Sequence, residues 1–249
     1  MSGLRARASS PSKWRVVIIP GAPSKFVLFQ RLLRLAPPQL DVSVVMRAGY
    51  GDSRRTRREP ILSFEEQIAA IMPLLQQQDD CRTIVMGVSY GGALALKAAI
   101  DNPHLIGGVL TCAMLVDKPR SFANVAVEIG GMFGVQGLLP EDAFIARHEI
   151  VSRRSQIAPI FSRLSEMRQP VSILHGDRDH LVSLGSAREL RAYFRQDADI
   201  SLTVVPGGTH YIEFERPRLV LGELQKLINR AERQREKKKA GAGEETEPA

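Results

Sequence analysis

Cysteine and aromatic residues are scarce in this chain. Among 249 residues there are two cysteines, and Phe, Trp and Tyr together make up 6%. Two cysteines do not form a disulfide framework, and Cys81 and Cys112 both stand in apolar surroundings, so we expect buried free thiols. A reducing compartment is consistent with that state.

Long apolar runs and ligand clusters are missing as well. The longest apolar runs are far shorter than the roughly 20 residues of a membrane-spanning helix. Residues 1–13 carry arginines and serines but no apolar stretch of the kind found in a secretory signal. We therefore expect a cytoplasmic protein. The sequence also has no metal-ligand cluster and no dinucleotide fingerprint, so neither a metal nor another cofactor is expected.

Positive charge is in excess, with a formal net charge of +7. Much of it is local, in a cluster at 54–58 and at the end of the chain (Arg54, Arg55, Arg57, Arg58; Arg230, Arg233, Arg235, Lys237, Lys238, Lys239). No aromatic residues alternate with these charges, so nucleic-acid binding is not favoured. We interpret them as a solvated loop and tail. The alternative is weak contact of the basic tail with an anionic surface.

The most informative stretch is 87–92, which reads Gly-Val-Ser-Tyr-Gly-Gly. An apolar run at 83–86 precedes it and an alanine-rich run at 93–100 follows it, which predicts a strand, a sharp turn and a helix. This is the G-x-S-x-G pattern of a nucleophile elbow, which lifts the hydroxyl of Ser89 towards a helix amino terminus where free N–H groups favour negative charge. The alternative is a glycine turn that only joins a strand to a helix.

The rest of the chain alternates between predicted strands and helices. β-Branched or apolar runs predict strands at 16–19, 42–46, 83–86, 108–113, 170–174 and 200–205, separated by helical patterns such as 63–75, which begins with a Ser63 cap, and 217–232. This alternation predicts an α/β fold with a mostly parallel sheet of about six strands flanked by helices. We expect one domain over 14–231, a disordered terminus at 1–13 and a disordered charged tail at 232–249.

One stretch interrupts the alternation. Residues from about 115 to 169 are too many for an ordinary connection between a helix and a strand. The stretch leaves the edge of the sheet that carries Ser89, so we predict a small lid insertion with helices of its own. The alternative is a peripheral insertion that only packs against the domain.

Ser89, Asp179 and His210 all fall in loops that leave the carboxyl ends of predicted strands, where sites form in parallel sheets. A histidine can take the proton of a serine, and a buried carboxylate can orient that histidine. The backbone N–H groups of Ala22 and Tyr90 stand where an oxyanion hole is expected. Rival acids are Asp117 and Asp177, and rival bases are His104, His148, His175 and His180.

From Trp14 to about Arg230 the chain resembles the α/β-hydrolase superfamily. The motifs that carry the resemblance are Pro20-Gly21, the segment 47–53 (Arg-Ala-Gly-Tyr-Gly-Asp-Ser), the elbow at 87–92, the segment 175–182 and Gly-Gly-Thr-His at 207–210. The resemblance implies Ser89 as nucleophile, Asp179 as acid and His210 as base. Members that use an aspartate nucleophile are disfavoured. The family often has His-Gly at Pro20-Gly21, and its two usual leading strands have no room before Trp14.

These residues predict a serine hydrolase that cleaves small carboxylic esters or thioesters through a covalent acyl-enzyme. The alternative is a catalytically silent ligand-binding or scaffold protein that kept the fold, since fold does not fix function.

Overall fold

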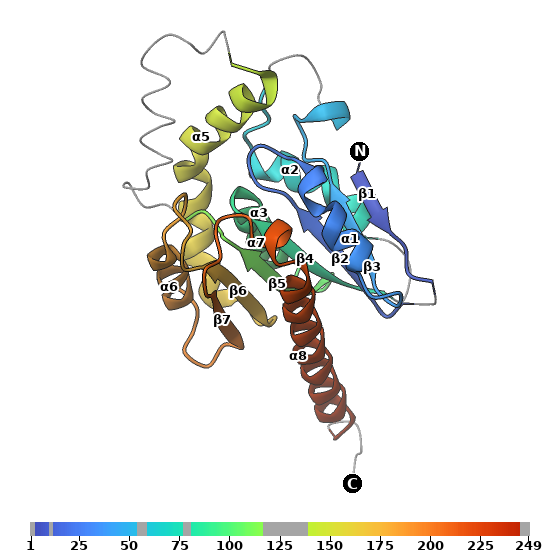
Figure 1. Cartoon of the computed structure of the whole chain (residues 1–249). Coiled ribbons are helices and arrows are strands. Elements are labelled where there is room, and N and C mark those ends of the chain that lie inside the picture. Colours follow the sequence, from blue (N-terminus) through green and yellow to red (C-terminus); the bar gives the residue numbers. More distant parts are fainter. Residues whose placement is uncertain (1–2, 10–11, 54–58, 77–80, 117–138, 245–249) are drawn as a thin grey trace.

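A seven-stranded sheet forms the centre of the molecule, in the order β1-β3-β2-β4-β5-β6-β7 (Figure 1). The computed structural model describes residues 3–9, 12–53, 59–76, 81–116 and 139–244. The strands are β1 (Gly3–Ala6), β2 (Trp14–Ile19), β3 (Asp41–Val45), β4 (Arg82–Val88), β5 (Ile106–Cys112), β6 (Val171–Gly176) and β7 (Ile200–Val205).

Strands β2 to β7 pair in parallel, which confirms the predicted α/β fold and its six parallel strands. Every residue of β2 is buried, as expected where helices cover both faces of a parallel sheet. Successive side chains of that strand point to opposite faces of the sheet. Val17 and Ile19 belong to one hydrophobic core, while Val16 and Ile18 belong to the core on the opposite face.

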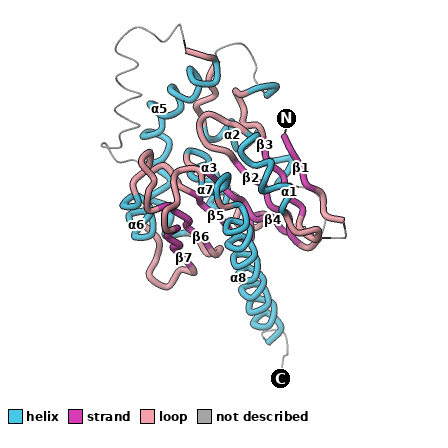
Figure 2. The backbone as a smooth tube through the Cα atoms, in the orientation of Figure 1, coloured by secondary structure: helices cyan, strands magenta, loops and turns pink. Residues whose placement is uncertain are grey.

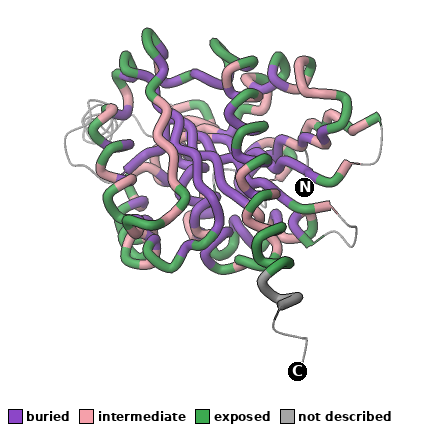
Figure 3. The backbone as a smooth tube through the Cα atoms, turned by 90° about the horizontal axis from the view of Figure 1, so that it is seen from below, coloured by how far each residue is buried: buried purple, intermediate pink, exposed green. Residues whose placement is uncertain are grey.

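Helices cover both faces of the sheet, as the cyan and magenta segments of Figure 2 show. The first core is closed by α2 (Phe64–Leu75), α3 (Tyr90–Asp101), α5 (Glu141–Arg163) and α6 (Leu184–Ala192). The second is closed by α1 (Gln30–Leu35) and α8 (Pro217–Glu244), with η1 (Phe26–Phe29) and α7 (Ile212–Glu215) beside them. Short 3-10 turns, η2 (Gly51–Ser53) and η4 (Leu164–Glu166), complete the described elements. Figure 3 shows the buried strands enclosed by half-buried and exposed segments.

The prediction of a disordered terminus at 1–13 is wrong for 3–6, which lie among the described residues of that range. Residues Gly3–Ala6 form β1, which adds an antiparallel seventh strand to the edge of the sheet beside β3. The Nε of Arg5 donates a hydrogen bond of 2.9 Å to Asp41 on β3. The strand is short and its residues are only exposed or half-buried, so it leaves almost no apolar pattern in the sequence.

The prediction of a disordered tail is wrong for 232–244, because α8 continues to Glu244. The indole N–H of Trp14 donates to Glu232, and the side-chain amide of Gln234 donates to the carbonyl of Arg168. These contacts fix the helix beyond Ala231, and the Glu, Lys and Arg residues that follow are good helix formers. In Figure 1 the last turns of α8 extend away from the sheet.

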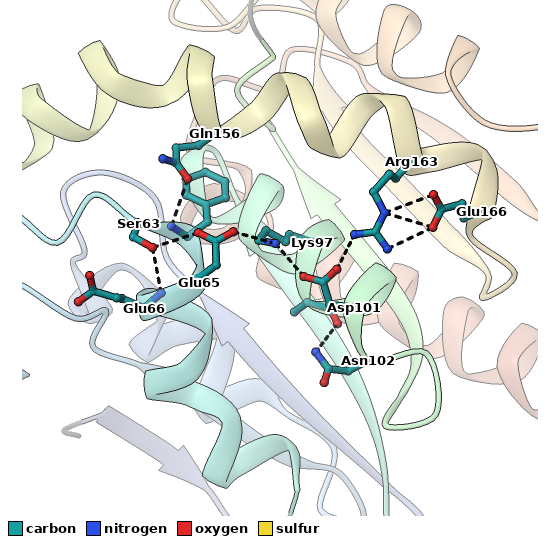
Figure 4. Close-up of polar contacts among 11 residues, drawn as sticks. Ser63, Glu65, Glu66, Lys97, Asp101, Asn102, Gln156, Arg163 and Glu166 are labelled. Atoms are coloured by element: carbon teal, nitrogen blue, oxygen red, sulfur yellow. Dashed lines mark hydrogen bonds and ion pairs between the residues drawn. The ribbon is translucent and has the colours of Figure 1, made fainter.

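The insertion predicted at 115–169 lies partly outside the described residues, since 117–138 are not described. Its main described element is α5, which packs on α3. Figure 4 shows polar contacts that join α5 to α2 and α3, including a 2.7 Å ion pair from Arg163 to Asp101 and a hydrogen bond from Phe64 N–H to Gln156. The lid role remains a prediction.

None of the described helices combines the length and the apolar character that crossing a bilayer requires. Neither cysteine is in a disulfide bond. Cys112 is buried as expected, but Cys81 is only half-buried.

Candidate active site

Ser89 sits in a sharp turn between β4 and α3, with φ 50° and ψ −118°. Such a positive φ is uncommon for a residue with a side chain and stores local strain. The surrounding structure holds the turn: Ser89 N–H donates to the carbonyl of Cys112 at 2.9 Å, and the Ser89 carbonyl accepts from Leu115 N–H at 3.2 Å. The predicted strand, turn and helix are therefore confirmed.

Two glycines make this turn sterically feasible. A Cβ atom on Gly87 would lie 2.2 Å from the carbonyl oxygen of Gly91, and a Cβ on Gly91 would lie 2.2 Å from the carbonyl oxygen of Ile19. Neither position accommodates a side chain. The glycine spacing in the sequence is thus a consequence of α3 being pressed against β4 and β2.

Asp179 and His210 meet across the loops that follow β6 and β7. The His210 Nδ1 donates a 2.8 Å hydrogen bond to Asp179 Oδ2, while Asp179 Oδ1 accepts from the backbone N–H groups of Leu181 and Val182. Burial opposes the charge on Asp179, but the hydrogen bonds and the imidazole charge outweigh it and hold its pKa below the usual value. Because Nδ1 carries the proton, Nε2 is the ring nitrogen left to accept another one.

A cavity of about 300 Å³ opens between these loops and the elbow. Ser89 and His210 both line it, together with Gly21, Ala22, Leu181 and Glu213. Two of the three side chains predicted from the sequence thus share one cavity, and the third is hydrogen-bonded to one of them.

The backbone after β2 passes directly against Ser89. A Cβ on Gly21 would lie 3.0 Å from the Cβ of Ser89 and 3.7 Å from its Oγ. The next residue, Ala22, lines the same cavity. Tyr90 is the first residue of α3, so its N–H is one of the groups without a partner in the helix itself.

Residues 16–223 match the family described as the alpha/beta hydrolase family. The chain belongs to the α/β-hydrolase family. The match covers the sheet from β2 to β7 and the elbow at Ser89. It therefore confirms the family and the fold that the resemblance implied.

Solved structures of the same fold cover nearly the whole chain. A monoacylglycerol lipase of Paleococcus ferrophilus has a TM-score of 0.68 and 20% identity, over 91% of this chain and 100% of that one. MenH of S. aureus has a TM-score of 0.70 and 14% identity, over 92% and 98%. A soluble variant of the monoglyceride lipase of Saccharomyces cerevisiae has a TM-score of 0.71 and 15% identity, over 92% and 91%. At such identities the likeness shows the fold alone, and no curated protein matches this chain.

Within this α/β-hydrolase domain, the rival acids and bases occupy other places. Asp177 is exposed and accepts a 2.7 Å hydrogen bond from Gly207 N–H, which joins the loops after β6 and β7. Asp117 lies outside the described residues. His175 is buried, its Nε2 donates to the carbonyl of Val182 at 2.8 Å, and burial lowers its pKa. That nitrogen is 3.5 Å from Asp179, against 2.8 Å for His210.

The remaining histidines, His104, His148 and His180, do not line the cavity. His148 contacts the carbonyl of Phe144 on its own helix, α5. His104 and His180 are exposed. Among the described histidines, His210 is therefore the one that lines the cavity together with Ser89. The described residues also hold no group of three or more His, Cys, Asp or Glu side chains arranged for a metal ion.

Glu213 is a site residue that sequence reasoning missed. It lies in α7, lines the cavity, and is 1% exposed. Its Oε2 has no hydrogen-bond partner among the described residues, and burial raises its pKa to about 7. A glutamate in a short exposed-looking segment gives no sequence signal for such burial.

A second buried cluster was also missed. Arg47, in the loop after β3, pairs with Glu149 of α5 through Nη1 at 2.5 Å and Nη2 at 2.8 Å. Its Nη1 also donates to Gln67 Oε1 at 2.7 Å, and Tyr50 Oη donates to Glu149 at 2.6 Å. Arg47 stands in a recognised motif, but nothing in the sequence connects it with Glu149.

Proposed function

We propose that this protein is a serine hydrolase of small carboxylic esters or thioesters that works through an acyl-enzyme. Ser89 attacks the carbonyl carbon, and His210 takes its proton and returns it to the leaving group. Asp179 holds the imidazole in the required tautomer and stabilises its charged form. The observation that carries this proposal is the cavity lined by both Ser89 and His210, with His210 hydrogen-bonded to the buried Asp179.

The tetrahedral intermediate needs hydrogen-bond donors for its negative oxygen. We assign these to the backbone N–H groups of Tyr90 and Ala22, since Tyr90 is the first residue of α3 and Ala22, in the loop after β2, lines the cavity with Ser89. Removing one such donor raises the barrier by about 3 kcal/mol in measured cases. The macrodipole of α3 favours the same negative charge.

The cavity favours a small substrate. Its apolar lining comes from Leu28, Phe29, Val88 and Leu181, and its volume of about 300 Å³ is at the lower end of ligand pockets. Monoacylglycerol and monoglyceride, named for two of the structural neighbours, are carboxylic esters. This favours an oxygen ester over a thioester.

The test is turnover of p-nitrophenyl acetate by Ser89→Ala. We expect a loss of about 10⁴-fold or more in kcat, because the nucleophile is gone. Ser162→Ala, an exposed serine on α5, is the matched control and should retain the wild-type rate. An unchanged rate in Ser89→Ala contradicts the assignment.

A fluorophosphonate probe separates this function from the silent binding protein. The probe should modify Ser89 in the wild type, as located by peptide mass spectrometry, and leave Ser89→Ala unmodified. Folded wild-type protein that neither reacts with the probe nor hydrolyses esters supports the ligand-binding or scaffold alternative.

A further inference from the structure

Arg47 is a fully buried cation that lies beside the cavity without lining it. Its side chain is 1% exposed and that of Glu149 is 0% exposed. Burial alone opposes the charge on Arg47, but the facing carboxylate of Glu149 outweighs it and raises the pKa of the guanidinium above its usual value. The guanidinium therefore stays charged, and neither side chain lines the cavity.

The guanidinium contacts the loop that passes over Ser89. The Nη2 of Arg47 donates a 2.8 Å hydrogen bond to the carbonyl oxygen of Gly21. That carbonyl belongs to the same peptide unit as the N–H of Ala22. The Gly21–Ala22 peptide is trans, since the cis bond among the described residues is the next one, Ala22-Pro23. In a trans peptide the C=O and N–H groups point in opposite directions. Drawing the Gly21 oxygen towards Arg47 therefore turns the Ala22 N–H away from Arg47.

The direction of that N–H matters because Gly21 is packed against the nucleophile. A Cβ on Gly21 would lie 3.0 Å from the Cβ of Ser89 and 3.7 Å from its Oγ, and Ala22 lines the same cavity, so the Gly21–Ala22 peptide borders the site of Ser89. The peptide has two broad orientations. With the carbonyl on Arg47, the N–H is available to an anion formed at Ser89; with the peptide reversed, the carbonyl oxygen would repel that anion.

The same guanidinium contacts the residue that carries the other donor. The Cζ of Arg47 lies 4.8 Å from the centre of the Tyr90 ring, and 4.9 Å from that of Tyr50. Tyr90 is fully buried, and its ring packs edge-on against Phe64 at 5.3 Å. One cation thus touches the ring of Tyr90 and the carbonyl of Gly21, which belong to the two backbone segments that border the oxygen of the intermediate.

Glu149 holds the guanidinium in this place. It binds both terminal nitrogens of Arg47 from α5, while Gln67 of α2 bonds to both partners. A planar fork with several fixed donors can satisfy Glu149, Gln67 and Gly21 together, whereas the single ammonium of a lysine cannot reproduce that geometry. We propose that Arg47 is a positioning residue that orients the Gly21–Ala22 peptide for oxyanion binding, and that Glu149 is the carboxylate on α5 that fixes it. This inference rests on the proposed ester hydrolysis.

The first test is Arg47→Lys, which keeps the charge and removes the fork. We expect kcat for p-nitrophenyl acetate to fall about 10- to 100-fold with KM within about twofold, since a misplaced donor weakens the transition state rather than the ground state. The affinity for a trifluoromethyl ketone, which forms a tetrahedral oxyanion with the serine, should fall by the same factor as kcat/KM. A normal kcat in folded Arg47→Lys, or a loss confined to KM, overturns the proposal.

The second test separates positioning from stability. Arg47→Met combined with Glu149→Met removes both charges together, and such replacements of buried pairs are often neutral for stability. Since the variant leaves no unpaired buried charge, we expect its thermal midpoint to fall less than that of Glu149→Met alone, but its kcat to be as low as that of Arg47→Lys. Recovery of wild-type kcat in the folded double variant overturns the proposal. Arg15→Lys is the matched control, because Arg15 is a buried arginine at the opposite end of β2, with Nη1 near the carbonyl of Leu74; its kcat should be unchanged.

A crystal structure of each variant decides the question without turnover. Absence of both turnover and probe labelling in the wild type would remove the proposed function, but the orientation of the Gly21–Ala22 peptide is still observable. A reversed or displaced peptide in Arg47→Lys and in the double variant supports the positioning role. An unchanged peptide in both overturns it.

Discussion

Two buried side-chain pairs, Asp179 with His210 and Arg47 with Glu149, stand at the carboxyl edge of the sheet, and their exposure to the cavity differs. Asp179 has a fully buried side chain, but that of its partner His210 is 11% exposed and faces the cavity. In the other pair, Arg47 and Glu149 are 1% and 0% exposed. Proton transfer requires access to the substrate, so only the first pair can take part in chemistry. The Arg47–Glu149 pair, called the sealed pair below, can act only by holding the backbone in place.

The two pairs also differ in how far they reach along the chain. Asp179 is fixed by the N–H groups of Leu181 and Val182, both in its own loop. Arg47 depends on Glu149, 102 residues away on α5. The geometry of the first pair is therefore set locally, whereas that of the second depends on the docking of a whole helix.

The largest expected effect is on the Asp179–His210 pair, called the open pair below. Asp179→Asn removes the charge that stabilises the imidazolium and presents a donor where His210 needs an acceptor. We expect kcat for p-nitrophenyl acetate to fall by about 10³- to 10⁴-fold, with the fold retained by circular dichroism. Asp177→Asn is the control, because that carboxylate bonds to Gly207 outside the cavity, and its kcat should change by no more than about threefold. Equal losses in both variants would mean that the pairing with His210 has no special role.

The next effect concerns the sealed pair. Glu149→Leu leaves Arg47 as an uncompensated buried charge, which costs about 3–5 kcal/mol of unfolding free energy in comparable cases. Urea unfolding followed by fluorescence measures it. Glu149→Gln, which keeps an acceptor oxygen for the guanidinium, should lose less. A loss within about 1 kcal/mol for Glu149→Leu would show that Arg47 finds another anion or water, and that the pair is not sealed.

Glu213 is a third buried carboxyl group and has no cationic partner within hydrogen-bond distance among the described residues. Its pKa is raised to about 7 from 4.5, so the folded state holds its proton more tightly than the unfolded state does. Wild-type stability should therefore fall as pH rises from about 4.5 to about 7, and the loss is complete above that range.

Glu213→Gln removes this titration. The stability of the variant relative to the wild type should grow across the same range by roughly 3 kcal/mol, since each unit of pKa shift corresponds to about 1.4 kcal/mol. Thermal or urea unfolding at several pH values between 5 and 8 measures the difference. Glu236→Gln, an exposed residue of α8, should show no such trend. A pH-independent difference for Glu213→Gln would mean that this carboxyl is solvated.

The sequence predicted the parallel strands because most of them, such as β2 and β6, are buried on both faces and read as apolar runs. It failed for β1 and for the end of α8, where tertiary contacts rather than apolar pattern decide the structure. Gly3–Ala6 is ordered by pairing with β3, and the helix beyond Ala231 is fixed by Trp14 through Glu232. Both segments are polar enough to be taken for solvated chain.

The open pair and the serine were predictable for a related reason. Ser89, Asp179 and His210 each follow a strand within a short run of turn residues, so local pattern marks all three. Glu149 and Glu213 are different, because their roles depend on being buried among residues of other elements and not on a local sequence pattern. Their neighbours come from other elements, such as Arg47 for Glu149, and no local spacing encodes that proximity.

The smallest expected effect tests whether burial is what separates the sealed pair from other contacts of the same helix. Arg163, on α5, pairs with Asp101 of α3 at 2.7 Å, but these side chains are 42% and 32% exposed (Figure 4). Exposed pairs contribute about 0–1 kcal/mol, so Arg163→Ala should change the unfolding free energy by less than about 1 kcal/mol and leave kcat unaltered. A double-mutant cycle with Asp101→Ala measures the coupling. If Arg163→Ala costs as much stability as Glu149→Leu, then the exposed pair contributes as much as the buried pair to the docking of α5. The Arg47–Glu149 contact would then not be the main link between α5 and the Gly21–Ala22 peptide.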